Sequence, residues 1–224
     1  MRLKHLYGRF VMRVKQSLKI GSFPGSALYW EERYKKGRDS GPGSYNRLAI
    51  FKSEILNGFV EKNRIFSVIE FGCGDGNQLS LAKYPKYTGL DVSPSAIALC
   101  ADKFRDDRSK SFFLYHSKAF VDNHALLKAE LALSIDVIFH LVEDDIFNNY
   151  MSHLFNAAEK YVIIYASNFD KKQLFHEKDR NFTAWIDQNR KEWKLLEKID
   201  NIYPQNPEDP ENTSKADFFI FSKG

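Results

Sequence analysis

From residue 66 onward, short apolar segments of strand length alternate with segments whose apolar residues recur at helical spacing. The predicted strands are 66–71, 87–91, 111–115, 131–135 and 161–165, followed by a closing pair at 193–199 and 217–221. Predicted helices begin at Ser93, at Asp144 or Asp145, and at Phe182. Serine before proline at positions 93 and 94 is typical of a helix start, because serine caps free N–H groups and proline fits the first helical position. The alternation predicts an α/β three-layer sandwich that binds ligands at the carboxyl ends of its strands.

The first 22 residues form a separate pattern, a predicted basic amphipathic helix. Its apolar residues recur at helical spacing: Leu3, Leu6, Phe10, Val14 and Leu18. Two interpretations remain open, because the helix can pack on the domain or on a partner, or make a weak contact with an anionic membrane surface. A Gly/Ser-rich linker follows at 21–26. We therefore divide the chain into this helix (1–22), an N-terminal cap with a helix and a Gly/Ser loop (23–64) and a ligand-binding domain (65–224).

The amino-acid composition excludes several classes of protein. The 224 residues are 43% hydrophobic and 15% aromatic, which is enough to fill the core of one medium domain. Two cysteines, Cys73 and Cys100, are too few for a disulfide framework or a zinc knuckle. The sequence has no signal-peptide pattern and no apolar run of the roughly 18–20 residues that cross a bilayer. We therefore expect a soluble cytoplasmic protein, with the inner face of the membrane as its alternative location.

The net charge of +4 arises at the N-terminus. Residues 1–19 hold six basic residues and no acid, and the rest of the chain has 27 basic against 29 acidic residues. A protein that binds DNA or RNA along its surface carries an excess of basic residues there. The sequence therefore predicts no nucleic-acid partner.

The most informative segment is the glycine loop, residues 70–77 (Glu-Phe-Gly-Cys-Gly-Asp-Gly-Asn), which follows the first strand and is expected to precede a helix. Glycines at positions 72 and 74 let the backbone turn tightly and approach a ligand. A dinucleotide fingerprint would need a third glycine at position 77, where the chain has Asn77, so an NAD-dependent oxidoreductase is disfavoured. Asp91 ends the next strand, where a carboxylate can accept hydrogen bonds from two ribose hydroxyls.

The glycine loop, followed by Gly-Leu-Asp-Val-Ser at 89–93, resembles the class I S-adenosylmethionine (SAM)-dependent methyltransferases. The resemblance covers residues 66–166 and implies a Rossmann-like, seven-stranded, mostly parallel sheet with one antiparallel strand. It also implies that SAM is the cofactor of the 65–224 domain and that S-adenosylhomocysteine (SAH) is the product. The implied cofactor-binding residues are Glu70, Gly72, Gly74, Gly76 and Asn77 around the methionine part, Asp91, Val92 and Ser93 around the ribose and adenine, and His116 or its neighbouring backbone near the adenine amine.

An aromatic segment lies upstream at 29–37 and is followed by the Gly/Ser loop at 40–45. Aromatic faces attract a sulfonium cation, and hydroxyl and backbone N–H groups bind a carboxylate. The segment resembles the N-terminal cap of a set of bacterial methyltransferases found alongside glycan-assembly enzymes. That resemblance adds Trp30, Tyr34 and Ser44 to the implied cofactor site. The alternative is that Trp30 and Tyr34 are core residues of a docked helix.

Residues 134–141 follow the fourth strand, where the family places catalytic or substrate-binding groups. Asp136 and His140 are one helical turn apart and can share a face, and a histidine there can take the proton of a hydroxyl during methyl transfer. The segment resembles methyltransferases of small molecules, including some that hold a metal. Phe139 replaces the second acid of that pattern, so we expect no metal. The alternative role of Asp136 and His140 is to close the cofactor pocket or to order the loop.

A third polar cluster follows the fifth strand, where His176 and Arg180 precede a Phe-Thr-x-Trp helix at 182–185. Arginine binds phosphate or carboxylate through a bidentate fork, so we assign both residues to the acceptor. A solvated loop is the alternative.

These features predict a SAM-dependent O-methyltransferase whose acceptor is a sugar or glycan, phosphorylated, acidic or lipid-linked. Two alternatives remain, a small-molecule O-methyltransferase of another pathway and a SAM-binding protein without catalytic activity. The glycan acceptor rests on the resemblance alone, because a fold does not determine its substrate. The sequence carries no signal for an oligomeric state.

Overall fold

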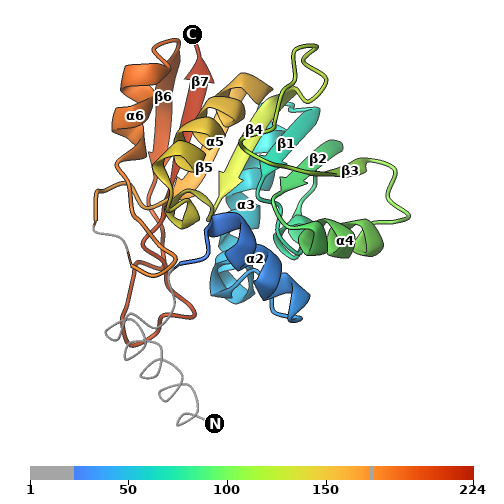
Figure 1. Cartoon of the computed structure of the whole chain (residues 1–224). Helices are drawn as coiled ribbons and strands as arrows, with labels where there is room; N and C mark the ends of the chain where they lie inside the picture. The colour runs from blue at the N-terminus through green and yellow to red at the C-terminus, as the bar shows by residue number, and fades with distance from the viewer. Residues whose placement is uncertain (1–22, 172–173) are drawn as a thin grey trace.

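The computed structural model describes residues 23–171 and 174–224, so the helix expected over 1–22 lies outside the described residues. Seven strands form one sheet in the order β3-β2-β1-β4-β5-β7-β6 (Figure 1). The strands are β1 (Ser67–Phe71), β2 (Lys86–Asp91), β3 (Lys110–Leu114), β4 (Ala129–Ile135), β5 (Ala158–Ala166), β6 (Trp193–Ile199) and β7 (Asp217–Lys223). β7 is antiparallel to both neighbours, and the other pairs are parallel. The expected mostly parallel sheet with one antiparallel strand is confirmed.

Helices cover both faces of the sheet and make the expected three layers (Figure 1). The α-helices are α2 (Ser26–Lys35), α3 (Asn46–Lys62), α4 (Pro94–Lys103), α5 (Asp144–Ala157) and α6 (Phe182–Asn189), and the 3-10 helices are η1 (Pro42–Ser44), η2 (Gln78–Leu81) and η3 (Ile138–His140). Apolar side chains of α5 and α6 pack on one face of the sheet, and those of α3, η2 and α4 pack on the other.

The central strand β5 shows how the chain fills both cores. Val162 and Ile164 belong to the core beneath α5 and α6, whereas Ile163 and Tyr165 belong to the core beneath α3. Successive side chains of a strand point to opposite faces, so a strand covered on both faces must be apolar at nearly every position. This explains why the segment 161–165 is the most apolar of the predicted strands.

Two elements differ from the expectation. Helix α3 was not predicted, because its buried side includes a charged residue, Lys52, and the hydroxyl of Ser53, which interrupt the apolar stripe. No α-helix follows the glycine loop. The connection from β1 to β2 spans residues 72–85, and the tight turns of the loop leave room only for the four-residue η2.

The order of the strands creates the crevice in which such sheets bind ligands. From β1 the chain builds outward through β2 and β3 on one side and then returns to place β4 on the other side of β1. The connections after β1 and β4 therefore diverge at their carboxyl ends, which leaves room for a ligand between them. Helix α2 lies at this end of the sheet, next to the point of β4 (Figure 1).

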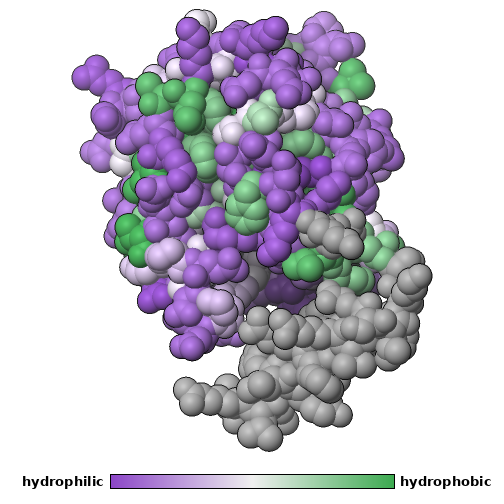
Figure 2. Space-filling model, turned by 90° about the vertical axis from the view of Figure 1, so that its left-hand side faces the viewer, coloured by the Kyte–Doolittle hydropathy of each residue, from purple (hydrophilic) through white to green (hydrophobic). Residues whose placement is uncertain are grey.

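The surface gives a simple picture where it is described. Among the helices of 23–171 and 174–224, none combines the length and the apolar character needed to cross a bilayer. Figure 2 shows the side of the molecule that lies on the left in Figure 1, where apolar patches are small and separated by hydrophilic residues. Isolated exposed apolar side chains are ordinary on folded domains.

Candidate active site

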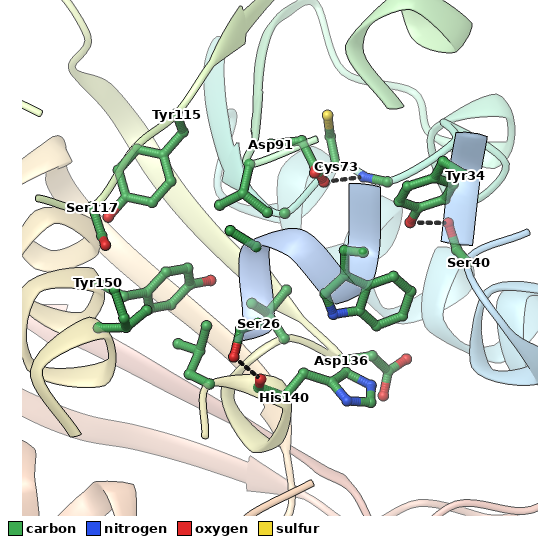
Figure 3. A pocket seen from close by; sticks show the side chains of 18 of the residues that line it. Ser26, Tyr34, Ser40, Cys73, Asp91, Tyr115, Ser117, Asp136, His140 and Tyr150 are labelled. Atoms are coloured by element: carbon green, nitrogen blue, oxygen red, sulfur yellow. Dashed lines mark hydrogen bonds between the residues drawn. The ribbon is translucent and has the colours of Figure 1, made fainter. Parts of the chain in front are cut away.

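A cavity of about 360 Å³ lies at the carboxyl ends of β1, β2 and β4, beneath α2 (Figure 3). This volume is within the usual range of small-molecule sites. Eleven of the residues expected at the site line it: Trp30, Tyr34, Ser44, Glu70, Gly72, Gly74, Asp91, Val92, His116, Asp136 and His140. The structure thus brings together residues from five separate segments of the chain.

The glycine loop is closely enclosed by two other segments. Gly72 and Gly74 have positive φ angles of 89° and 57°, which residues with a side chain rarely adopt. A Cβ on Gly72 would lie 2.4 Å from Cγ2 of Val137, and a Cβ on Gly74 would lie 2.5 Å from Oγ of Ser40. Both positions therefore require glycine, because a methyl group would push the loop away from the segment after β4 or from the cap.

Asp91 presents a buried carboxylate to the cavity. Its Oδ2 accepts the N–H of Gly74 at 2.9 Å and its Oδ1 accepts the N–H of Ser93 at 2.9 Å. A carboxylate offers about four acceptor positions, so about two remain for a ligand. Burial raises the pKa of Asp91 to about 6, against the lowering effect of these N–H donors. The site suits a pair of ligand hydroxyls.

Glu70 lies in β1 and is buried at the floor of the cavity. Its Oε2 accepts a hydrogen bond from the hydroxyl of Tyr87 at 2.6 Å. Burial raises the pKa of Glu70 to about 7, although Tyr87 and the charge of Lys52 lower it. A bound cation would favour the ionised carboxylate, so Glu70 is suited to a positively charged ligand.

Asp75 fastens the Gly/Ser loop to the glycine loop. Its Oδ2 accepts the N–H of Ser40 at 2.8 Å and the hydroxyl of Tyr45 at 2.9 Å, while its own N–H donates to Oγ of Ser40 at 3.1 Å. Tyr34 joins the same group, with its hydroxyl 3.0 Å from Oγ of Ser40 (Figure 3). These bonds hold the cap over the cavity.

Helix α2 is fixed by carboxylates on both sides of the cavity. Glu143 accepts the N–H and the hydroxyl of Ser26, at 2.9 Å and 2.6 Å, at the start of α2. Glu31, farther along α2, accepts the hydroxyl of Ser93 at 2.6 Å and the N–H of Ser95 at 3.0 Å, at the start of α4. Carboxylates stabilise helix N-termini, where N–H groups lack partners. The two contacts set the position of α2 over the site.

Asp136 and a buried lysine form an ion pair at the far end of the cavity. Asp136 has a φ of 59°, and its Oδ2 lies 2.5 Å from Nζ of Lys52. The side chain of Lys52 is fully buried, and a buried charge needs a partner of opposite sign. The pair holds the Asp136 carboxylate beside the ring of His140 (Figure 3).

His140 ends η3 and contacts both the cap and the loop after β5. Its Nδ1 lies 3.2 Å from the carbonyl oxygen of His176, and its ring meets that of Trp30 edge to face at 5.0 Å. Burial, together with the charge of His176, lowers the pKa of His140 to about 4. The imidazole is therefore neutral at pH 7 and keeps one nitrogen lone pair for a ligand or a proton.

Three residues assigned to the cofactor lie behind the cavity wall rather than on it. A Cβ on Gly76 would lie 2.8 Å from the ring of Phe104, so this glycine allows α4 to pack closely. The side chain of Asn77 donates to the carbonyl of Ser44 at 2.7 Å. Ser93 caps α4 by accepting the N–H of Ala96 at 3.0 Å. These contacts shape the loop and the cap.

The two residues assigned to the acceptor also lie outside the cavity lining. Arg180 donates to the carbonyl of Leu141 at 3.0 Å and to Asp144 at 2.6 Å, so it holds the start of α5. His176 stacks on Tyr29 with ring centroids 4.7 Å apart, next to His140. His176 is thus close to the site, whereas the donors of Arg180 are occupied by protein.

Several site residues were not predicted from the sequence. Lys52 was not predicted because it lies 84 positions from its partner Asp136. Ser26 and Glu143, also not predicted, are 117 positions apart. Tyr150 closes another wall, where its hydroxyl donates to the carbonyl of Phe71 at 2.9 Å. No local pattern indicates such contacts, because the residues meet only after the sheet has formed. Asp75 could have been predicted from the sequence, since it lies inside the glycine loop.

No protein-family model and no curated protein matches this chain. Solved structures do match it. The N-methyltransferase NodS from Bradyrhizobium japonicum WM9, in complex with SAH, has a TM-score of 0.70 and 14% identity, over 89% of this chain and 98% of NodS. Magnesium protoporphyrin IX methyltransferase (ChlM) from Synechocystis PCC 6803, with bound SAM, has a TM-score of 0.58 and 14% identity, over 79% of each chain. The methyltransferase domain of bacterial CtHen1-C has a TM-score of 0.58 and 21% identity, over 77% of this chain and 97% of that domain.

At sequence identities of 14% to 21%, the similarity between this chain and these structures concerns the fold alone. The chain has the Rossmann-like fold of the class I SAM-dependent methyltransferases, and it covers nearly all of NodS and of the CtHen1-C domain.

Proposed function

We propose that this protein is a SAM-dependent methyltransferase that acts on a hydroxyl of a sugar or glycan. The observation that carries the proposal is one continuous cavity with two chemically different ends. One side has the glycine loop and the buried carboxylate of Asp91, and the other side has Asp136 and His140, with α2 between them in Figure 3. A transferase needs such a cavity, because cofactor and acceptor must meet in one water-excluding site.

The residues at the first end fit SAM. Asp91 has acceptor positions left for the ribose hydroxyls, and Glu70 suits the positively charged methionine part. Val92 and His116 line the wall beyond Asp91, where the adenine would lie. When bound, SAM supplies a methyl group activated by a positively charged sulfur. The aromatic ring of Trp30 and the phenol ring of Tyr34 line the same cavity, and aromatic faces stabilise such a cation.

Two NodS structures differ in how well they match this chain. The NodS structure described with SAH has a TM-score of 0.70 and matches 89% of this chain. A second NodS structure, described without that compound, has a TM-score of 0.60 and matches 80%. The protein is therefore more similar to the structure described with SAH than to the second NodS structure.

His140 and Asp136 are the residues that we assign to the chemical step. A ring nitrogen of His140, neutral because burial lowers its pKa, accepts the proton that the acceptor hydroxyl loses. Asp136, held by Lys52, places a negative charge beside the ring and stabilises the resulting imidazolium. The residues around them exclude water and orient the hydroxyl.

The acceptor end also carries the chemistry that binds sugars. Trp30 and His140 line the cavity there, and their rings continue outside the lining into a row of contacting rings with Tyr29 and His176. A sugar places its C–H faces on aromatic rings and its hydroxyls on polar groups, and this end offers both. Arg180 takes part indirectly, because its guanidinium holds the backbone that follows His140.

The proposal is tested with labelled SAM and extracts that contain bacterial polysaccharide or lipid-linked glycan. We expect label in a glycan as a methyl ether, identified by mass spectrometry. Label confined to small molecules would instead support an O-methyltransferase of another pathway, and SAH binding without transfer would support a non-catalytic SAM-binding protein. RNA belongs in the same assay, because the small RNA methyltransferase HEN1 is similar in structure (TM-score 0.58, 18% identity). Label in RNA would overturn the assignment of a glycan acceptor.

A further inference from the structure

His140 has two neighbours that proton transfer does not require. A ring nitrogen of His140, a ring nitrogen of His176 and a carboxylate oxygen of Glu177 all lie within 4.8 Å of one another. Nε2 of His176 is 3.7 Å from Oε1 of Glu177. The two imidazole rings are almost parallel, with an angle of 10° and a centroid separation of 5.5 Å. Three side chains that commonly bind metals thus converge beside the acceptor end of the cavity.

We propose that His140, His176 and Glu177 bind a divalent transition-metal ion, and that zinc is the ion best suited to them. Two imidazoles and one carboxylate form a ligand set of catalytic zinc sites, which keep a fourth position open for water or substrate. Bonds of about 2.0–2.1 Å in a tetrahedral site place the ligand atoms about 3.3 Å apart. The cluster therefore needs an inward movement of no more than about 1.5 Å, which side-chain rotation can supply.

Neighbouring residues hold the cluster in place and leave it open to solvent. Nζ of Lys215 donates to Oε2 of Glu177 at 3.0 Å, which leaves Oε1 toward His176. The N–H of Lys178 donates to the carbonyl of Phe139 at 2.8 Å and so ties the loop of His176 to η3. Hydrogen bonds that orient ligands support metal affinity, whereas the positive charge of Lys215 beside Glu177 opposes it. The side chains of His176 and Glu177 are 26% and 31% exposed, which gives an ion a route from solvent.

The ion would change how the acceptor is activated. His140 lines the cavity, whereas His176 and Glu177 do not, so an ion held by all three would lie at the edge of the cavity. With an ion bound, the pKa of a hydroxyl on it would fall, the proton would pass to solvent water at this exposed edge, and His140 would serve as a ligand in place of its role as proton acceptor in the metal-free chain. This use of the ion rests on the proposed function, but the binding of the ion does not. The sequence argued against a metal because Phe139 is not an acid, and Glu177 supplies the missing carboxylate from a distant loop.

The test uses the full chain, freed of metal with a chelator. Zn²⁺ is titrated in competition with a coloured chelator, and Co²⁺ is added separately to record the absorption of its ligand field. We expect one Zn²⁺ per chain and a Co²⁺ spectrum typical of nitrogen and oxygen ligands in a tetrahedral site. His176→Ala and Glu177→Gln should each weaken Zn²⁺ at least about 100-fold, since they remove ligands and not merely supporting groups. His124→Ala and Glu208→Gln, both at exposed positions, are matched controls and should bind like the unaltered chain.

Each other outcome contradicts the proposal. Absence of stoichiometric Zn²⁺ binding, or equal affinity in His176→Ala, Glu177→Gln and the controls, would overturn it, with circular dichroism used to show that the variants are folded. An intense thiolate-to-cobalt band would place the ion on Cys73 and Cys100 and would overturn it as well. SAH binding to the metal-free chain is measured in parallel by calorimetry. Zinc binding without SAH binding would refute the proposed function alone, and SAH binding without zinc binding would refute the metal site alone.

Discussion

Two buried carboxylates in the wall of the cavity make the binding of the cofactor sensitive to pH. Burial raises the pKa of Asp91 to about 6 and that of Glu70 to about 7. The ionised forms accept hydrogen bonds from ribose and attract a cation, so protonation opposes binding. We expect SAH to bind at least about tenfold more weakly at pH 5 than at pH 8, since each group costs roughly tenfold per pH unit below its pKa. Calorimetric titration across this range measures the effect.

The control for this prediction is Glu70→Gln, which leaves Asp91 as the titrating group. The midpoint of the affinity change should then move from about 7 toward about 6. An affinity that stays constant from pH 5 to pH 8 would contradict the assignment of these residues. The raised pKa values of Asp91 and Glu70 also affect the stability of the fold. Protonation of the two carboxyl groups stabilises the folded chain at low pH, and this stabilisation is lost as the pH rises through about 6 to 7.

His140 provides a second prediction for a single residue. His140→Ala should lower kcat by about 10²–10⁴-fold while SAH affinity changes by less than about threefold, because the ring lies at the acceptor end of the cavity. Steady-state kinetics and SAH calorimetry measure the two quantities on the same preparation, with His124→Ala as the control at an exposed position. Loss of SAH affinity with little change in kcat would instead make His140 a part of the cofactor pocket.

At the scale of elements, the closure of the cap depends on the contacts of Asp75. Asp75→Ala removes the acceptor of the N–H of Ser40 and of the hydroxyl of Tyr45. The cap should then open more often, so we expect SAH to dissociate at least about tenfold faster, as two hydrogen bonds of roughly 1 kcal/mol each would allow. Stopped-flow measurement of SAH release tests this.

Two further variants serve as comparisons for the rate of SAH release from Asp75→Ala. Tyr45→Phe deletes one of the two bonds and should show an intermediate rate, while Asp102→Ala changes an exposed acid on α4 and should release SAH at the original rate. A folded Asp75→Ala protein with an unchanged rate would show that the cap is held by other contacts, such as those of Glu143 and Glu31.

The elements also show how far the sequence alone can lead. The strands and the helices α4, α5 and α6 were predictable, because their periodicity and capping residues are local signals. The glycine loop and Asp91 were predictable as a pair, since β1 and β2 are neighbours in both sequence and sheet. Helix α3 was missed because Lys52 occupies a buried position in its stripe, and that lysine makes sense only with Asp136 from another segment. The proposed metal cluster has no local sequence signal for a similar reason, because its side chains come from η3 and from the loop after β5.

At the scale of the whole molecule, residues 1–19 differ in net charge from the rest of the chain. The described residues form a three-layer domain, and the side of it that Figure 2 shows is largely hydrophilic. The six basic residues of 1–19 give the chain its positive charge, and without them basic and acidic residues nearly balance. Attraction to anionic lipid would thus depend on this segment, at about 1 kcal/mol per basic residue near the surface. A lipid-linked glycan acceptor would place the enzyme at such a surface.

Deletion of residues 1–20 tests membrane binding separately from cofactor binding. We expect the shortened chain to bind vesicles with anionic lipid at least about tenfold more weakly than the full chain, while SAH affinity stays the same, because the lining residues among the described part of the chain begin at Pro24. Co-sedimentation with vesicles measures the first quantity and calorimetry the second. Vesicles of neutral lipid are the control, and there both chains should bind equally weakly. Equal binding of both chains to anionic vesicles would show that the segment contacts the domain or a partner, and strong, salt-sensitive RNA binding by the shortened chain would contradict the charge argument against a nucleic-acid acceptor.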